Sequence, residues 1–191
     1  MLSRILCVVL LLALPLTSLG QAYQSSNGFF FLPEVDVAQF QGRPYRYQVS
    51  VRYQPADTTA KVGVWAMQVG KNEYDFKQRD YPTQTIRPNE WQTNTIQGQI
   101  RPGVRRLWFY STLAGNGTFW FDNLTLQVQQ PNGTWQPVPI KNGDFEHSAT
   151  PLAGYEMADK VLPAGVVAAL APGQGPDQSQ ALRITMTGAR W

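Results

Sequence analysis

The chain has 191 residues, and its 16 Lys and Arg against 13 Asp and Glu give a formal net charge of +3. Its basic residues are scattered, with Arg105-Arg106 as the only adjacent pair, so the sequence lacks the dense basic run of a nucleic-acid-binding surface. Hydrophobic residues make up 43% of the chain, which is enough for one ordinary core.

The N-terminal segment predicts export. Arg4 supplies a positive start, residues 5–16 form an apolar run too short to span a bilayer with ease, and the small residues Gly20 and Ala22 follow. This order is typical of a secretory signal peptide over residues 1–22, cleaved near Ala22. We therefore expect an extracellular or periplasmic protein with no membrane span. Because Cys7 leaves with the signal, the remainder has no disulfide, thiol nucleophile or cysteine metal ligand.

The first half of the remaining chain reads as a series of strands. Residues 29–37 predict a strand broken near Pro33, and residues 45–53 alternate apolar and polar side chains without a break. Residues 62–69 and 91–100 predict two more strands. No segment between residues 23 and 130 has the periodicity of an amphipathic helix.

Strand patterns continue toward the C-terminus. Residues 105–112 and 119–128 predict two strands joined by the Gly115-Asn116-Gly117 turn, and Asn132-Gly133 predicts a hairpin turn into residues 135–140. Beyond Glu146 the composition shifts to Ala, Gly and Pro, and residues 181–186 form a clear final strand. Short strands separated by Gly, Pro and Asn turns predict an all-β fold, an antiparallel β-sandwich.

Several motifs resemble the galactose-binding-like jelly rolls of carbohydrate-binding modules, including cellulose-, xylan- and β-glucan-binding types. Residues 40–47 (FQGRPYRY) are similar to the family's "Gly-Lys-x-Tyr" strand start, and Trp91 to its structural Trp. Residues 119–124 (FWFDNL) resemble its closing strand. The strand containing residues 64–67 (VWAM) also resembles N-terminal modules of secreted bacterial esterases and peptidases.

The order of these motifs differs from the family's order. Residues 142–146 (NGDFE), predicted as a turn leading into a strand, and residues 179–184 (SQALRI) resemble the family's first two strands but follow the closing strand. One explanation is a single circularly permuted jelly roll over residues 23–191. The other is a module over residues 23–130 followed by the start of a truncated second module over residues 141–191. We favour permutation, because a chain ending after two strands would expose unpaired edges.

The resemblance implies that aromatic side chains on one sheet face or loop contact a polysaccharide or glycan, with acids and amides binding its hydroxyls. If Leu107 and Phe109 face the core, strand alternation directs Trp108 and Tyr110 to the open side. Residues 70–82 mix charged and aromatic residues, which suits either a ligand-binding loop or a hairpin whose rings pack on the sandwich edge. The candidate ligand-binding residues are Trp65, Tyr74, Phe76, Tyr81, Trp108 and Tyr110.

Three further aromatic residues, Trp91, Trp120 and Phe121, are expected in the core, because large aromatics within structural strands usually pack.

The resemblance also implies a structural Ca²⁺ at the junction of the first and last strands. The matching positions are Glu146 and Asp122, with Asp144 as a further ligand, and hard oxygen ligands suit calcium. The family often has Asp-Asp where this chain has Asp122-Asn123, so one negative charge is missing. The alternative is that these two residues cap a β-bulge by hydrogen bonds.

Catalytic motifs are lacking. The single histidine, His147, has no Gly-x-Ser-x-Gly partner element, and spacing alone pairs no two carboxylates across a cleft. We therefore expect a secreted, non-enzymatic carbohydrate-binding domain. The alternative is an extracellular domain that contacts a protein partner or has a structural role without sugar binding.

Overall fold

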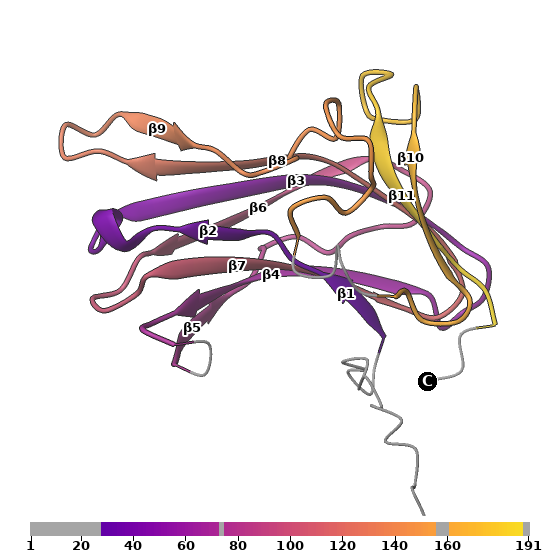
Figure 1. Cartoon of the computed structure of the whole chain (residues 1–191), viewed down its shortest axis with the longest axis horizontal. Coiled ribbons are helices and arrows are strands. Elements are labelled where there is room, and N and C mark those ends of the chain that lie inside the picture. The colour runs from indigo at the N-terminus through magenta and orange to yellow at the C-terminus, as the bar shows by residue number, and fades with distance from the viewer. Residues whose placement is uncertain (1–27, 73–74, 156–160, 189–191) are drawn as a thin grey trace, which may run out of the picture.

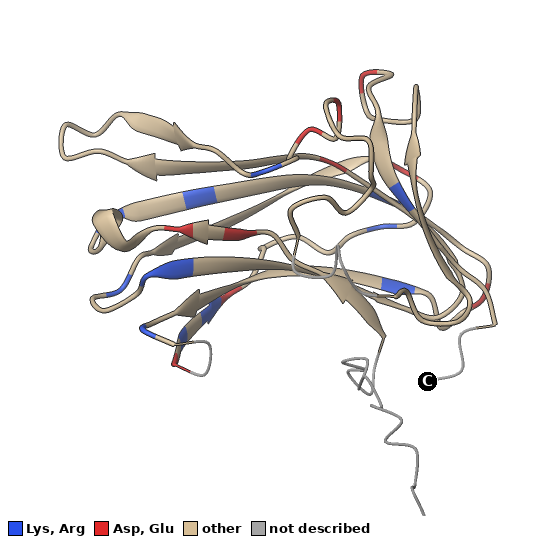
Figure 2. Ribbon diagram, in the orientation of Figure 1, with Lys and Arg blue, Asp and Glu red and all other residues tan. Residues whose placement is uncertain are grey.

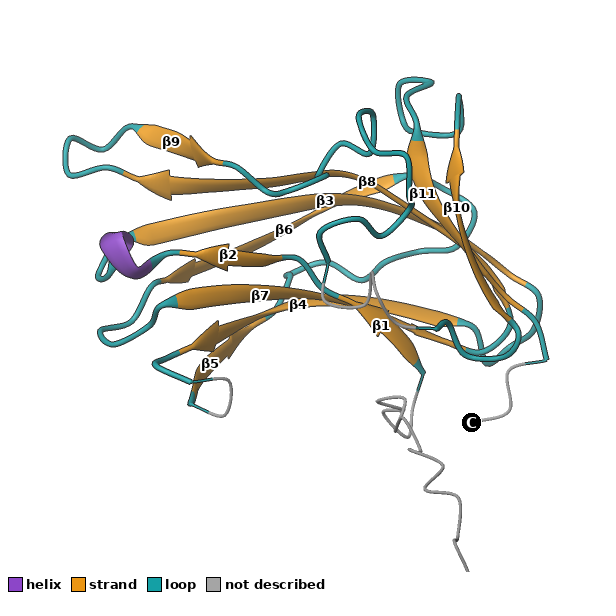
Figure 3. Cartoon of the chain, viewed as in Figure 1, coloured by secondary structure: helices purple, strands orange, loops and turns teal. Residues whose placement is uncertain are grey.

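The computed structural model describes residues 28–72, 75–155 and 161–188, so the predicted signal peptide and Tyr74 lie outside the described residues. The described residues form two antiparallel sheets packed face to face (Figures 1 and 3). The predicted antiparallel β-sandwich is therefore confirmed. The only helical element described is the short 3-10 turn η1 (Ala38–Phe40), and no described helix is long or apolar enough to cross a membrane.

The smaller sheet has five strands. Its main order is β1-β7-β4-β5, and β2 pairs with β7 beyond the end of β1. The bounds of these strands are β1 (Phe29–Phe31), β2 (Glu34–Asp36), β4 (Lys61–Val69), β5 (Phe76–Asp80) and β7 (Arg106–Ala114).

The larger sheet has six strands. Its main order is β10-β11-β8-β3-β6. On the side of β8 away from β3, β11 pairs with its first half and β9 with its second half. The bounds of these strands are β3 (Pro44–Pro55), β6 (Gln92–Gln99), β8 (Gly117–Gln129), β9 (Trp135–Val138), β10 (Val166–Ala171) and β11 (Ala181–Met186).

One stretch predicted to start a strand is not a strand. Residues 142–146 form turns and bends, and both Asn142 and Phe145 have left-handed backbone with φ of 53° and 58°. That conformation cannot continue a pleated strand. The segment instead fills the gap along β8 between β9 and β11, where the Leu124 N–H donates to the Gly143 carbonyl at 2.8 Å. The prediction of a strand start here was wrong.

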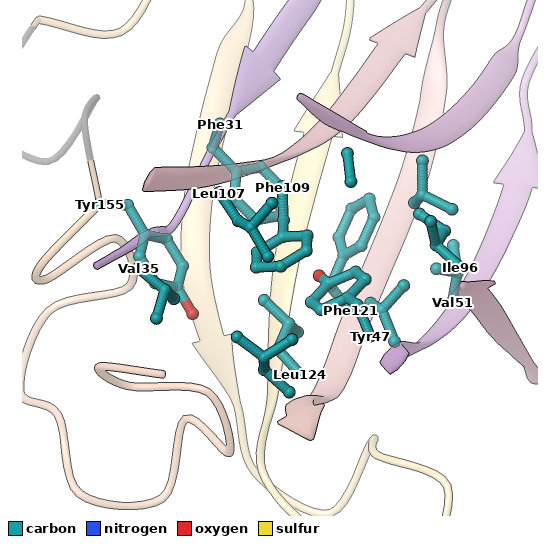
Figure 4. Close-up of a cluster of buried hydrophobic side chains, with 14 of the residues drawn as sticks. Phe31, Val35, Tyr47, Val51, Ile96, Leu107, Phe109, Phe121, Leu124 and Tyr155 are labelled. Carbon is teal, nitrogen blue, oxygen red and sulfur yellow. The ribbon is translucent and has the colours of Figure 1, made fainter. Parts of the chain in front are cut away.

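The core lies between the sheets and draws on both ends of the described chain. Strand alternation points Tyr47, Phe109 and Phe121 inward, and all are at most 1% exposed (Figure 4). Phe109 of β7 stacks on Tyr47 of β3 with ring centroids 4.0 Å apart, which joins the two sheets at their centre. Phe145 and Ile184 from the C-terminal third belong to the same apolar cluster.

A polar network closes the side of the sandwich where β5 and β6 meet. The Tyr45 hydroxyl donates to Asp80 Oδ2 at 2.7 Å, and Gln68 Nε2 donates to the same oxygen at 2.8 Å. Gln68 also donates to the Gln99 carbonyl of β6 at 3.0 Å. Burial, and then the bond to Asp80, raises the pKa of Tyr45 far above its usual value. The network therefore ties an edge strand of one sheet to an edge strand of the other.

Candidate functional site

Five of the six predicted ligand-binding aromatics gather on the outer face of the five-stranded sheet. Trp65 comes from β4, Trp108 and Tyr110 from β7, Phe76 from β5, and Tyr81 follows β5 directly. Tyr74, the sixth, lies outside the described residues. Neighbouring rings lie within 6.4 Å of one another, centroid to centroid. We call the five rings, together with Phe30 of β1, the aromatic face.

Alternation along β7 produces this arrangement. Leu107 and Phe109 are fully buried in the core, so Trp108 and Tyr110 between them point to the opposite side of the sheet. In the register of β4 with β7, Trp65 is directly opposite Tyr110. Their rings stack in parallel, with centroids 3.9 Å apart and an interplanar angle of 3°.

The stack continues across four strands, and this determines which rings a ligand can reach. Phe30 packs on Tyr110 at 5.5 Å, and the Arg79 guanidinium of β5 lies over the Trp65 ring at 5.2 Å. Both faces of the Trp65 and Tyr110 rings are therefore contacted by neighbours. Phe76 and Tyr81 are 50% and 59% exposed, so the accessible aromatic area lies at the β5 side.

Charged side chains adjoin the aromatic face. Glu34 of β2 accepts a hydrogen bond from Trp108 Nε1 at 2.5 Å and pairs with Arg106 at 3.3 Å. The Arg106 guanidinium also lies 5.6 Å from the Trp108 ring centroid. The face thus combines exposed rings with an acid and two arginines, Arg79 and Arg106, that can bind hydroxyl groups.

Sequence reasoning did not identify the contributions of Phe30, Glu34, Arg79 and Arg106. Their places depend on β1, β2 and β5 pairing beside β7 and β4, which local periodicity does not specify. The segment of residues 70–82, considered as a ligand-binding loop or an edge hairpin, contains β5, which pairs with β4. Phe76 and Arg79 lie on the outer side of this pairing, against Trp108 and Trp65.

The predicted calcium ligands lie beside the loop between β10 and β11. Asp122 has no exposed surface; its Oδ2 accepts from Ser179 Oγ at 2.5 Å and its Oδ1 from the Asn123 N–H at 2.7 Å. Glu146 Oε1 accepts from the Gln180 N–H at 2.6 Å. Asp122 and Glu146 therefore contact consecutive residues of the same loop.

Asp144 is more peripheral. It is exposed, and its Oδ1 accepts from the Glu146 N–H at 3.2 Å. Within the described residues, no three His, Cys, Asp or Glu side chains are close enough to form a metal-binding group. The β-bulge considered as the alternative is present: the β3–β8 register shifts between Gln48 and Ser50, and Asn123 has a φ of 53°. Calcium binding stays a prediction.

The buried Asp122 carboxyl makes that prediction testable. Burial raises the pKa of Asp122 above its usual value, against the opposing effect of the hydrogen bonds from Ser179 and Asn123, and the negative charges of Glu146 and Asp144 raise the pKa further. The folded protein therefore binds the Asp122 proton more tightly than the unfolded chain does, so the protonated carboxyl stabilises the fold. This stabilisation is complete below the pKa that Asp122 has in the unfolded chain, and it is lost as the pH rises through the pKa that Asp122 has in the folded protein.

We therefore expect Asp122→Asn, measured in chelator, to raise the free energy of unfolding at neutral pH but not at acid pH. Excess calcium should raise the Tm of the natural protein by about 5 °C or more and leave the variant nearly unchanged. Thermal unfolding followed by circular dichroism, with calcium and with chelator, measures both effects. Equal melting of the natural protein in the two conditions rules out a stabilising calcium.

Three aromatics expected in the core have two different environments. Phe121 lies in the main core, whereas Trp120, 7% exposed, packs with Ala171 and Ala181 in a second cluster on the outer face of the six-stranded sheet. Trp91 is partly buried against this second cluster. The expectation of burial was right for Phe121 and Trp120, but the main core does not contain either tryptophan.

A pocket of about 540 Å³ lies between β8 and the loop that follows β9. Thr125, Lys141, Asp144 and His147 line it together with other residues of the loop. Gly143 forms part of its wall, at the point where the loop bonds to β8.

No family model matches the chain, and no curated protein or solved structure matches it either.

Proposed function

We propose that this protein is a secreted, non-catalytic module that binds a polysaccharide or glycan through the aromatic face. The supporting observation is that five aromatics, drawn from three strands and the segment after β5, converge on one outer sheet surface beside Glu34. Exposed rings are costly on a soluble surface unless something covers them, and a patch rimmed by charged groups is typical of a binding site.

The geometry suits sugar recognition at the β5 side of the face. Phe76 and Tyr81 offer ring surface for the apolar C–H faces of pyranose units. Arg79 of β5 can donate to hydroxyl groups at this side, and a ligand that extends across the face toward β2 would meet Arg106 as a donor and Glu34 as an acceptor. Because the Trp65 and Tyr110 rings stack on each other, they form a fixed pair against which the neighbouring rings Tyr81 and Trp108 pack.

We infer that residues 23–191 form one permuted domain and not a module over residues 23–130 followed by a fragment of a second one. In support, β11 pairs with β8 along Leu182 to Met186, and residues of β10 and β11 share the main core with β3 and β7. A permuted order requires a C-terminal strand to pair within a sheet of the same domain, as β11 does in the six-stranded sheet.

We expect Tyr81→Ala and Phe76→Ala each to weaken polysaccharide binding about tenfold, because each removes exposed aromatic contact area. The matched control is Val167→Ala on β10, which removes an apolar side chain, 60% exposed, outside the aromatic face. Retardation in gels containing cellulose derivatives, xylan or β-glucan, run on residues 23–191, measures the effect. A glycan array extends the test to other sugars.

Failure of every glycan to bind contradicts this proposal. The alternative, a domain that contacts a protein partner, is favoured by the observation that Trp65 and Tyr110 present ring edges instead of open ring faces. It predicts that Tyr81→Ala weakens capture of a protein partner without affecting any sugar.

A further inference from the structure

The strands of the six-stranded sheet, on the side of the sandwich opposite to the aromatic face, carry arginines but no exposed acid; exposed acids near them, Glu90, Glu146 and Asp177, lie in loops. These strands contain three arginines, Arg46 and Arg52 on β3 and Arg183 on β11, and a single acid, Asp122, which is fully buried. Acids of the other sheet lie on β2 and β5. Figure 2 shows basic positions on β3 and β11 and acidic positions on β2, with further acidic positions in the loops beside β8 and between β10 and β11. We call the surface around the three arginines the basic face.

These arginines lack counter-charges within the described residues. The ion pairs described there join Lys77 to Asp75, Arg87 to Glu90 and Arg106 to Glu34, none of which involves the basic face. Strand alternation fixes the outward direction of the three side chains, since Tyr45, Tyr47, Val51 and Ile184 beside them are buried in the core. Three unpaired cations on rigid strands attract an anionic ligand.

Arg52 is held in a distinctive position. Its guanidinium lies over the Trp120 ring at 4.1 Å and near the Trp91 ring at 5.5 Å, and Trp120 Nε1 is itself anchored to Gln174 at 2.7 Å. Trp120 is also the register partner of Arg183 on β11, so Arg183, Trp120 and Arg52 form one row across three strands. Neither the Arg52 guanidinium nor the Arg183 guanidinium donates a hydrogen bond to any described residue.

Contact with the indole rings orients the Arg52 guanidinium but uses none of its N–H groups. The N–H groups of a guanidinium lie at its edge, in a fixed fork that matches the two oxygens of a carboxylate. Arg52 is therefore a preorganised donor pair, with Arg183 two strands away to share the charge of an anionic ligand.

The opposite end of the basic face has a second arginine and tryptophan pair. Arg46 lies over the Trp135 ring at 4.8 Å and donates to Gln127 Oε1 from Nε at 3.1 Å and from Nη2 at 2.5 Å, which leaves its other N–H groups for a ligand. Arg46 and Arg52 are six residues apart on one strand, so roughly 20 Å separate them. Between them, Gln48 bonds to Thr95 at 3.3 Å, and the exposed Thr93 bonds at 3.2 Å to Ser50, which is itself buried.

We propose that the basic face binds an extended polysaccharide whose units carry carboxylates. The charges at its two ends match repeated carboxylates, and the accessible side chains of Gln48, Thr93 and Thr95 between them can bond to the hydroxyl groups of the sugar units. This ligand class and this surface are separate from the aromatic face, and the inference does not depend on it.

Single-stranded nucleic acid is the competing anionic polymer, and the same geometry disfavours it. Nucleic-acid-binding surfaces of this kind need open aromatic faces on which bases stack. Here the guanidinium groups of Arg52 and Arg46 lie over the rings of Trp120 and Trp135. Three cations along roughly 20 Å are also sparse for a polymer with a phosphate at every nucleotide.

The test measures binding of residues 23–191 to polygalacturonate and to fully methyl-esterified polygalacturonate, which has the same backbone without the charge. Retention is expected on the first polymer, not on the second, and should weaken as salt is raised. Arg52→Gln and Arg183→Gln should each weaken binding about tenfold. Arg183 lies outside the tryptophan contacts, so its variant tests the site even if Arg52→Gln disturbs the fold. Arg105→Gln, which removes an exposed charge from a loop, is the control and should have little effect.

Several results would overturn the inference. Equal binding of the esterified polymer shows that carboxylates are not recognised, and equal loss in Arg105→Gln shows a diffuse charge effect. Tighter binding of oligothymidylate than of polygalacturonate assigns the face to nucleic acid. Tyr81→Ala serves as the cross-check, because it should leave polygalacturonate binding intact. Loss in that variant places the acidic ligand on the aromatic face.

Discussion

Phe109→Ala is expected to lower the free energy of unfolding by about 3–5 kcal/mol, the largest loss for any single substitution proposed for this chain. Phe109 is fully buried on β7, stacks on Tyr47 at 4.0 Å and contacts the edge of Tyr45 at 6.5 Å. Truncation removes the ring that joins the centres of the two sheets and leaves a cavity between them. Urea unfolding followed by circular dichroism measures the loss, which corresponds to a fall in Tm of about 10 °C.

A substitution at Tyr47, which stacks on Phe109, provides a control that is expected to raise the free energy of unfolding instead of lowering it. The Tyr47 hydroxyl is fully buried and has no hydrogen-bond partner among the described residues. Burying an unpaired hydroxyl costs stability, so Tyr47→Phe should raise the free energy of unfolding by about 1 kcal/mol while keeping the stack with Phe109. A destabilising Tyr47→Phe contradicts the packing of this pair, and so does a Phe109→Ala loss below about 1 kcal/mol.

Strand alternation is the part of this fold that local sequence predicts well. In β7, the apolar sequence Leu-Trp-Phe-Tyr could not by itself show which residues face inward. The structure places Leu107 and Phe109 in the core, and in that case alternation directs Trp108 and Tyr110 outward, as expected from the sequence. A period of two residues is a property of the backbone, so one correct assignment sets the rest of the strand.

Which strands pair, and in which register, cannot be predicted from the alternation within each strand. The stack of Trp65 on Tyr110 requires the β4–β7 register, and the row of Arg183, Trp120 and Arg52 requires three strands from distant parts of the chain. A shift of one residue would turn either set to the opposite face. The sequence could therefore supply the aromatic candidates for a site, but not the charged residues beside them.

The strand prediction failed in three segments, since β5 and β10 were not predicted and residues 142–146 are not a strand. β5, with the sequence Phe-Lys-Gln-Arg-Asp, is an edge strand whose charges hide any apolar alternation. Residues 142–146 have an apolar residue, Phe145, that reaches the core from a left-handed turn and not from a strand. Asp122 and Glu146, predicted as calcium ligands, both bond to the loop at residues 179 and 180, and calcium binding itself stays a prediction.

Gly143→Ala is the second large effect expected, a loss of about 2–3 kcal/mol. Gly143 accepts from the Leu124 N–H at 2.8 Å, and a Cβ at this position would lie 2.5 Å from the Leu124 carbonyl oxygen. The Leu124 carbonyl belongs to the backbone of β8, so it cannot move aside for the added Cβ as a flexible side chain could. The loop must therefore move away from β8, which breaks this hydrogen bond and withdraws Phe145, buried at 0% exposure, from the core.

Gly133→Ala is the control, because it distinguishes the cost of a steric clash from the cost of placing alanine in left-handed backbone. Gly133, in the turn between β8 and β9, has a φ of 85° but no atom within 4 Å of an added Cβ, so Gly133→Ala should cost about 1 kcal/mol from backbone strain alone. Hydrogen exchange should then show the Leu124 amide deprotected in Gly143→Ala and protected in Gly133→Ala. If the two variants lose equal stability and both retain that protection, the loop does not rest against β8. The positions of Asp144 and Glu146 beside Asp122 would then lack the support that the calcium prediction requires.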